Sequence, residues 1–193
     1  MIDRDILDKM IDGDQLAFRE FVNHYSQLVF NTCLGFLHNK TDAEDVSQEV
    51  FIKVFNSISK FRAESKISTW LYRISINQSM NHLRNNRKQK FAKSIESFFA
   101  NSRNEKYEIA SYDMQPESYV ENKERAKNLQ NAINRLPEKQ KIAFTLSKFS
   151  DKSYNEISEI MDISIPSVES LIYRARKSLQ KNLLKCYKNI ANN

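Results

Sequence analysis

Glycine, proline, cysteine and histidine are all scarce in this sequence, and each scarcity excludes a class of structure. The 193 residues include only two glycines, Gly13 and Gly35, and three prolines. Hairpin turns, β-bulges and phosphate-binding loops need several glycines, so sheets and the Rossmann and P-loop nucleotide sites are excluded. Two cysteines 153 positions apart and three histidines without a paired spacing match no zinc motif or disulfide framework. The composition therefore predicts an all-α chain with no metal and no cofactor.

Long hydrophobic runs and catalytic constellations are also missing. No apolar stretch approaches the roughly 18 residues of a membrane span, and the first residues do not resemble a secretory signal. Paired carboxylates, a nucleophile with its base, and a metal cluster are all absent from the sequence pattern. We therefore expect a soluble cytoplasmic protein that is not an enzyme.

What the sequence does have is charge in separate blocks. The net charge is +6 overall. Residues 61–94 carry eight basic side chains against one acidic, and residues 126–193 carry twelve against six, whereas 1–60 and 95–125 are both net acidic. Two basic blocks indicate two surfaces for a polyanion, although lysines and arginines that merely solvate helices would give the same totals.

Helical periodicity in the first half predicts one compact domain over residues 1–93. Two apolar stripes follow a helical repeat, and a third helix begins at Ile67 with Trp70 and Leu71. Thr41 and Glu44 have the spacing of a capping box that would open the second helix. The members of the two stripes are Phe18, Phe21, Tyr25, Leu28 and Val29, then Val46, Val50, Phe51, Val54, Phe55 and Ile58.

The period is lost over residues 94–126, which we interpret as a flexible linker with a short helical piece near 95–99. It returns over residues 127–193, where Pro137 marks the first turn of a helix. Ser153 and Glu156 form a second capping box, which opens a short helix before a long amphipathic one. The second domain is therefore predicted to be helical too.

Residues 153–179 have the spacing of a helix-turn-helix, whose second helix enters the major groove of DNA. Asp162 stands where such turns often have glycine, and aspartate tolerates the left-handed backbone better than most residues. The basic second helix favours DNA contact over the alternative, an ordinary helical hairpin in a bundle. The apolar positions expected inside are Ile157, Met161, Ile163, Val168 and Leu171, and those expected on the exposed face are Ser167, Ser170, Tyr173, Arg174 and Lys177.

The basic block after Phe61 interleaves cations, amides and aromatic residues, which is the mixture that single-stranded nucleic acid needs. Its polar members step along one helical face, while the spacing of Trp70 fits core packing at least as well as base stacking. The polar members are Arg73, Asn77, Asn81, Arg84 and Lys88, with Arg62 and Lys66 in the preceding loop.

Several of these stretches together resemble a known family. Residues 42–93 are similar to the second conserved region of bacterial RNA polymerase sigma factors, and 127–185 to the fourth, which is the pattern of the extracytoplasmic-function (ECF) group. The matching stretches begin at Asp42, Phe61, Leu136, Ser153 and Arg174, and Gly13–Phe18 extends the match towards the N-terminus.

The resemblance implies partners and roles. The chain would bind core RNA polymerase through Asp45, Gln48, Glu49, Phe51 and Lys53. The segment from Arg62 to Lys88, with Lys66, Trp70, Arg73, Asn77, Asn81 and Arg84, would capture an unpaired −10 base. The helix-turn-helix would recognise the duplex −35 element through Ser167, Glu169, Ser170, Tyr173, Arg174 and Lys177. An anti-sigma protein is a further partner that the family implies.

Three positions depart from the family pattern. Glu169 and Leu171 stand where many relatives have lysine or arginine, and Asn81 replaces a common aspartate. Glu169 can accept a hydrogen bond from a cytosine amino group or oppose a phosphate. The competing hypotheses are a stand-alone helix-turn-helix regulator and a helical adaptor that contacts only protein.

Overall fold

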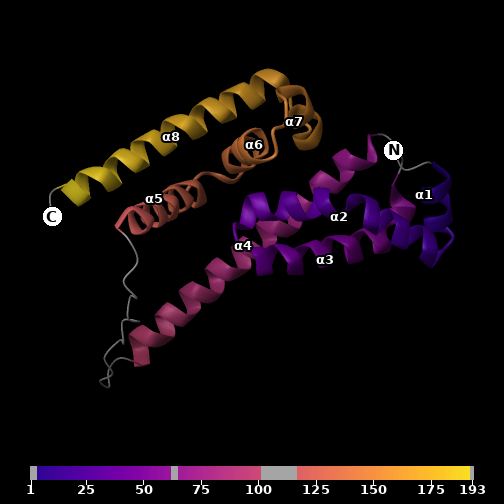
Figure 1. Ribbon diagram of the computed structural model, residues 1–193, viewed down its shortest axis with the longest axis horizontal. Helices are drawn as coiled ribbons and strands as arrows, with labels where there is room; N and C mark the ends of the chain where they lie inside the picture. The colour runs from indigo at the N-terminus through magenta and orange to yellow at the C-terminus, as the bar shows by residue number, and fades with distance from the viewer. Residues whose placement is uncertain (1–3, 62–64, 101–116, 192–193) are drawn as a thin grey trace. The chain divides into compact units, whose positions relative to one another are not determined.

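Helices make up the described part of the chain. The computed structural model describes residues 4–61, 65–100 and 117–191, and within these ranges it contains helices and turns but no strand (Figure 1). The all-α prediction is confirmed. The helices are α1 (Arg4–Ile11), α2 (Gln15–Leu37), α3 (Lys40–Ser57), the 3-10 helix η1 (Ile58–Lys60), α4 (Ile67–Ala100), α5 (Glu117–Asn134), α6 (Glu138–Phe149), α7 (Tyr154–Met161) and α8 (Ile165–Ala191).

The helices form two compact units, each assembled from segments that are distant in sequence. The first unit contains Met1–Arg87 and Thr145–Ile165, and the second contains Lys88–Phe144 and Pro166–Asn193. These units are defined by packing, whereas the predicted division into residues 1–93, 94–126 and 127–193 follows the sequence. The packing units do not test that division, which stays a prediction.

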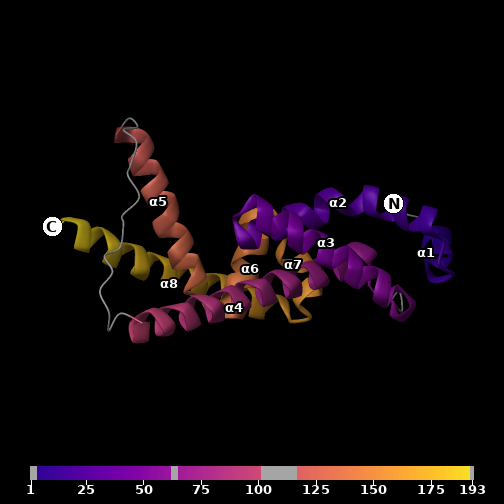
Figure 2. The ribbon, with the colours of Figure 1, turned by 90° about the horizontal axis from the view of Figure 1, so that it is seen from below.

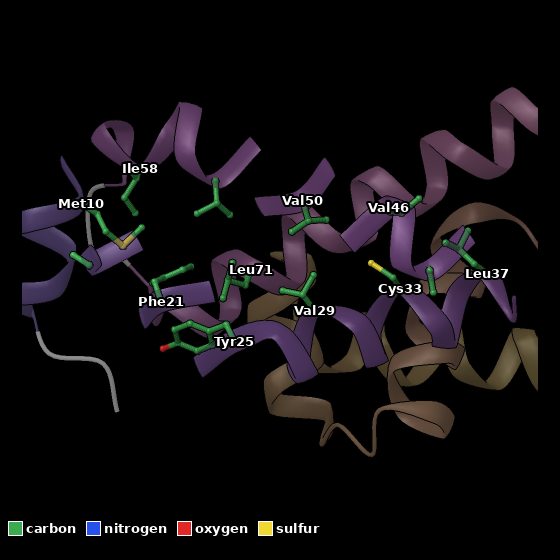
Figure 3. Packing of buried hydrophobic residues seen from close by; sticks show 13 residues of the cluster. Met10, Phe21, Tyr25, Val29, Cys33, Leu37, Val46, Val50, Ile58 and Leu71 are labelled. Atoms are coloured by element: carbon green, nitrogen blue, oxygen red, sulfur yellow. The ribbon is translucent and has the colours of Figure 1, made fainter. Parts of the chain in front are cut away.

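The core of the first unit lies between α2, α3 and the start of α4. α2 and α3 run side by side in both ribbon views (Figures 1 and 2). Phe21 and Val29 of α2, Val50 of α3 and Leu71 of α4 are fully buried and gather in one cluster, which Met10 of α1 closes at its end (Figure 3). Burying an apolar side chain of this size contributes about 1.5–3 kcal/mol, so this cluster holds the helices together.

The starts of α2 and α3 are set by polar side chains. Gly13 has a φ of +88°, a conformation suited to glycine, and Asp14 then accepts from the N–H groups of Leu16 and Ala17 at 2.7 and 3.3 Å. The prediction that Thr41 caps α3 is wrong. Asn39 is the cap, because its side chain accepts from the N–H of Asp42 at 3.0 Å.

The predicted apolar stripe of α3 is narrower than expected. Val46, Val50 and Val54 are fully buried, since residues four apart lie on one face. Phe51 is only partly buried, and Phe55 is 49% exposed. The two phenylalanines are each one position after a buried valine, which turns them about 100° away from the core.

The second unit has a smaller core of its own. Ala132 and Ile133 of α5 are buried with Ala175 and Leu179 of α8, and Phe144 packs against them. Lys141 of α6 is only 4% exposed, and its ammonium donates to the side-chain oxygen of Asn134 at 2.7 Å. Burial lowers the pKa of Lys141 to about 8, because a charged amine is disfavoured away from water.

Helix occupies both ends of the predicted linker, residues 94–126. α4 continues to Ala100, which includes the predicted helical piece at 95–99, and α5 begins at Glu117. Residues 101–116 between them lie outside the described ranges.

Candidate polymerase and nucleic-acid interfaces

The outer face of α3 carries the residues predicted to bind polymerase. Asp45, Gln48, Glu49 and Lys53 are exposed, and Phe51 is half-buried. Asp45 lies between Gln48 and Glu49 around the helix, within about 60° of each, so one face presents two carboxylates and an amide. The structure therefore brings the polar members of this set together.

An apolar hollow adjoins this face, and the sequence reasoning missed it. It has a volume of about 710 Å³ and is open to solvent. Ile52, which is 62% exposed, lies between Gln48 and Phe55 on the helix surface. The ring of Phe55 meets the ring of Phe18 of α2 edge to face, with centroids 5.1 Å apart. Exposed large apolar side chains next to a charged face are typical of a protein-binding surface. The lining residues are Gln15, Leu16, Phe18, Arg19, Val22, Phe51, Ile52 and Phe55.

The polar residues predicted for −10 recognition lie on α4 and in the loop before it. Asn77, Asn81, Arg84 and Lys88 are exposed and step along the helix by three or four residues, which places them on one face. Arg84 donates from Nη1 to the side-chain oxygen of Asn81 at 3.5 Å. Lys66 is exposed immediately before the helix, whereas Arg62 lies outside the described residues.

Trp70 and Arg73 differ from the rest of this set. Trp70 is partly buried against the core of the first unit, and its ring lies 5.2 Å from that of Phe61. Arg73 is also partly buried, and its guanidinium donates to the backbone carbonyls of Glu159 and Ile160 in α7. The structure therefore places Trp70 in the packing of the core, and it gives Arg73 two protein partners that the sequence did not indicate.

The predicted capping box at the start of α7 is confirmed. The hydroxyl of Ser153 accepts from the N–H of Glu156 at 3.3 Å, and the carboxylate of Glu156 accepts from the N–H and hydroxyl of Ser153 at 2.9 and 2.8 Å. Lys152 donates to the same carboxylate at 2.8 Å. The hydrogen bond from Lys152 and the two from Ser153 lower the pKa of Glu156 to about 2.

The turn after α7 has the expected left-handed residue. Asp162 has φ 54° and ψ 52°, and its N–H donates to the carbonyl of Ser158, as the N–H of Ile163 also does at 3.1 Å. α8 begins three residues later at Ile165. The interval between the two helices is therefore as short as a helix-turn-helix requires.

The residues predicted to contact the −35 element form the outer surface of α8. Ser167, Glu169, Arg174 and Lys177 are exposed and Ser170 is half-buried, while Tyr173 projects as one of the exposed large side chains. Of the five residues expected inside, Ile157 and Val168 are fully buried. Met161, Ile163 and Leu171 are only partly buried, and Ile160 and Ile172 are buried in addition.

Two kinds of feature are absent from the described residues. No group of three histidine, cysteine, aspartate or glutamate side chains in these ranges could hold a metal ion. None of the helices, as far as they are described, is long and apolar enough to cross a membrane.

Comparison with known proteins places both halves of the chain in one family. Residues 21–89 match Sigma-70 region 2, and residues 126–179 match Sigma-70 region 4. The RNA polymerase sigma-H factor of Pseudomonas aeruginosa is 34% identical over 185 residues, covering 94% of this chain and 93% of that one. The ECF RNA polymerase sigma factor SigW of Bacillus subtilis is 32% identical over 171 residues, covering 89% and 91%.

Solved structures agree on the fold. CnrH, in complex with the cytosolic domain of CnrY, has a TM-score of 0.59 at 20% identity and covers 95% of this chain and 97% of its own. The sigma factor RpoE, in complex with the anti-sigma factor NepR from Bartonella quintana, has a TM-score of 0.54 at 22% identity and covers 86% and 96%.

These matches decide between the hypotheses that the sequence left open. A stand-alone helix-turn-helix regulator would account for the region 4 match alone, whereas here region 2 is matched too and the relatives align along nearly their whole length. A protein-only adaptor is set aside for the same reason. The chain belongs to the ECF group of RNA polymerase sigma factors, which bind core RNA polymerase and direct it to promoters.

Proposed function

We propose that α3 binds core polymerase through Asp45, Gln48, Glu49, Phe51 and Lys53. The exposed carboxylates and amide of this face support the assignment, as does its position inside the region 2 match. Ile52 belongs to the same surface, because it is exposed between Gln48 and Phe55 and has an apolar side chain to bury. A polar face beside an apolar hollow suits a helical partner with charged and apolar sides.

The −10 element is assigned to α4 and the loop before it. Asn77 and Asn81 have amides that can pair with base edges, and the exposed cations Arg84 and Lys88 can follow the phosphates of an unpaired strand. Extruding a base costs a few kcal/mol, which binding in such a pocket offsets. The cationic set also includes Lys66, Arg73 and Arg62, of which Arg62 lies outside the described residues. Trp70 packs against the core of the first unit and so helps to position α4.

The −35 element is assigned to α8. Its exposed face carries Tyr173, Arg174 and Lys177 within the region 4 match, and Ser167, Glu169 and Ser170 complete it near the start of the helix. The N-terminal part of a recognition helix contacts base edges while cations further along bind phosphates. Glu169 is the residue of this set that can accept from a cytosine amino group.

Three further proposals concern the location of the chain, its lack of catalytic activity and its division into regions. The chain acts in the cytoplasm, has no catalytic site of its own, and divides into residues 1–93 for polymerase and −10 contact, 94–126 as linker and 127–193 for −35 contact. An anti-sigma factor is a further proposed partner, since RpoE was solved with the anti-sigma factor NepR. Such a protein would have to cover one of the three surfaces above.

The observation that carries these assignments is that the exposed polar faces of α3, α4 and α8 coincide with the two matched sigma regions. Run-off transcription with purified core polymerase on fragments of the host genome tests it. Glu49→Ala should weaken holoenzyme formation and Arg174→Ala should weaken promoter binding on every sequence. Removing one arginine–phosphate interaction should reduce the slope of log affinity against log salt by about 0.9.

The chain supplies a matched control for each variant. Glu44 is exposed on α3 but lies about 140° around the helix from Glu49, and Arg176 is exposed on α8 about 160° from Arg174, at about 100° per residue. Glu44→Ala and Arg176→Ala remove the same charges as the test variants. Because these residues lie away from the proposed faces, their effects on holoenzyme formation and promoter binding should be small. Equal losses within either pair would refute the assignment of that face.

A further inference from the structure

The side chain of Asn81, on the face of α4 assigned to the −10 element, is held in one orientation by a neighbour. Arg84 lies three residues further along the helix, and its Nη1 donates to Oδ1 of Asn81 at 3.5 Å. Residues at positions i and i+3 of a helix are neighbours on its surface, so the spacing itself brings the two side chains together. Both are exposed, and the pair is therefore accessible to a ligand.

The guanidinium decides which end of the Asn81 amide points outward. It has five N–H donors and no acceptor, so it attracts the carbonyl oxygen of the amide and not its NH2 group. Turning the amide over would place two donors against a cation. Within the part of the chain that the structure describes, Nδ2 of Asn81 has no hydrogen-bond partner. The end of the amide that points away from Arg84 therefore offers hydrogen-bond donors to a ligand.

Asn77, one turn earlier on the same face, lacks this constraint. Its side chain is exposed and makes no hydrogen bond to any of the described residues, so its amide can turn either way. An unconstrained amide can pair with adenine by accepting from N6 and donating to N7 at the same time. The two asparagines of this face consequently differ in the bases that they can recognise.

We propose that Asn81 selects an unpaired −10 base that carries a keto group, guanine or thymine, and that Arg84 is the positioning residue that makes Asn81 a donor. Guanine presents O6 and N7 as acceptors and thymine presents O4, whereas adenine and cytosine present an amino group in the corresponding place. An amino group in front of Nδ2 would set donor against donor. This inference rests on the proposed −10 role of α4 and names the class of base that one of its residues reads.

Transcription by holoenzyme, assembled from core polymerase and the full-length chain, tests the proposal. The templates carry an unpaired −10 element in which each position is in turn A, C, G or T. The quantity measured is the ratio of run-off product from the keto templates to that from the amino templates at each position. With the native chain, one position should favour the keto bases by about tenfold, as expected for one recognised base.

Two variants test the two residues separately. Asn81→Asp keeps the shape of the side chain and replaces its donors with acceptors. The preference at that one position should reverse towards adenine and cytosine, because a carboxylate accepts from an amino group. Arg84→Met removes the donors that orient the amide, so the amide can turn and the ratio should fall to about twofold or less. Both positions are exposed, so the variants should fold as the native chain does.

Arg87→Met is the matched control for Arg84→Met. It removes the same charge from an exposed position of α4 that lies about 120° around the helix from Asn81, at about 100° per residue. A weaker attraction to phosphates should lower the yield from all templates by a common factor. The keto-to-amino ratio should stay at its native value, and this ratio separates the positioning of Asn81 from a general loss of charge.

The ratios also separate this inference from the function on which it rests. A native holoenzyme with no keto preference at any position, or an Asn81→Asp variant that reverses none, would overturn base selection by Asn81. A native ratio in Arg84→Met, or an equal fall in Arg87→Met, would overturn the positioning role of Arg84. In these cases the native chain still directs transcription, whereas no product from any template would refute the proposed function and the inference together.

Discussion

The charge on Glu156 should stabilise the first unit, and the structure gives the size of the effect. Its carboxylate accepts from Lys152 and from both the N–H and the hydroxyl of Ser153. These hydrogen bonds lower its pKa from an ordinary 4.5 to about 2. Such a shift corresponds to about 3.4 kcal/mol at 1.36 kcal/mol per unit. The side chain is 46% exposed, so solvent screening reduces the contribution to about 1–2 kcal/mol.

Glu156→Gln should therefore lower the free energy of unfolding of the first unit by about 1–2 kcal/mol at pH 7. Because the pKa is depressed in the folded state, the stabilisation is fully present above pH 4.5 and is lost as the pH falls towards 2. The difference between native protein and variant should be constant from pH 7 to about pH 4.5 and shrink below it.

Urea unfolding followed by tryptophan fluorescence measures this difference. Trp70 is the single tryptophan and packs against the core of the first unit, so its signal reports that unit. Glu159→Gln removes the same charge from the same helix and is the control. A difference between native protein and Glu156→Gln that does not change between pH 7 and pH 2.5 would refute the electrostatic reasoning and leave only a loss of packing.

Two further predictions concern α6 and α4. The free energy of unfolding of the native protein should rise by at most about 3 kcal/mol between pH 8 and pH 10.5, because burial lowers the pKa of Lys141 to about 8 and the unfolded chain binds the proton more tightly. Lys141→Met should abolish this rise. Urea unfolding followed by circular dichroism at pH 7.5 and 9.5 measures it, and a rise that persists in the variant would contradict the prediction. Asn77→Ala should reduce run-off transcription most at promoters that carry the −10 base recognised by Asn77, and less at promoters with another base at that position. Gln89→Ala, about 120° around α4, should show no such selectivity. An equal loss on all −10 variants would count against base recognition by Asn77.

Local rules predicted the helix-turn-helix more accurately than the rest of the fold. The capping box of Ser153 and Glu156 and the left-handed Asp162 depend on side chains within three or four residues of one another, and the sequence states that spacing directly. The same kind of rule failed at α3, because Asn39 and Thr41 are both good caps and only the packing of the helix decides between them.

Longer-range features were beyond what the sequence could predict. α5 begins at Glu117, in a segment whose period is too weak to indicate a helix. The bonds from Arg73 to α7 join residues 86 and 87 positions apart, and backbone carbonyls have no sequence signature at all.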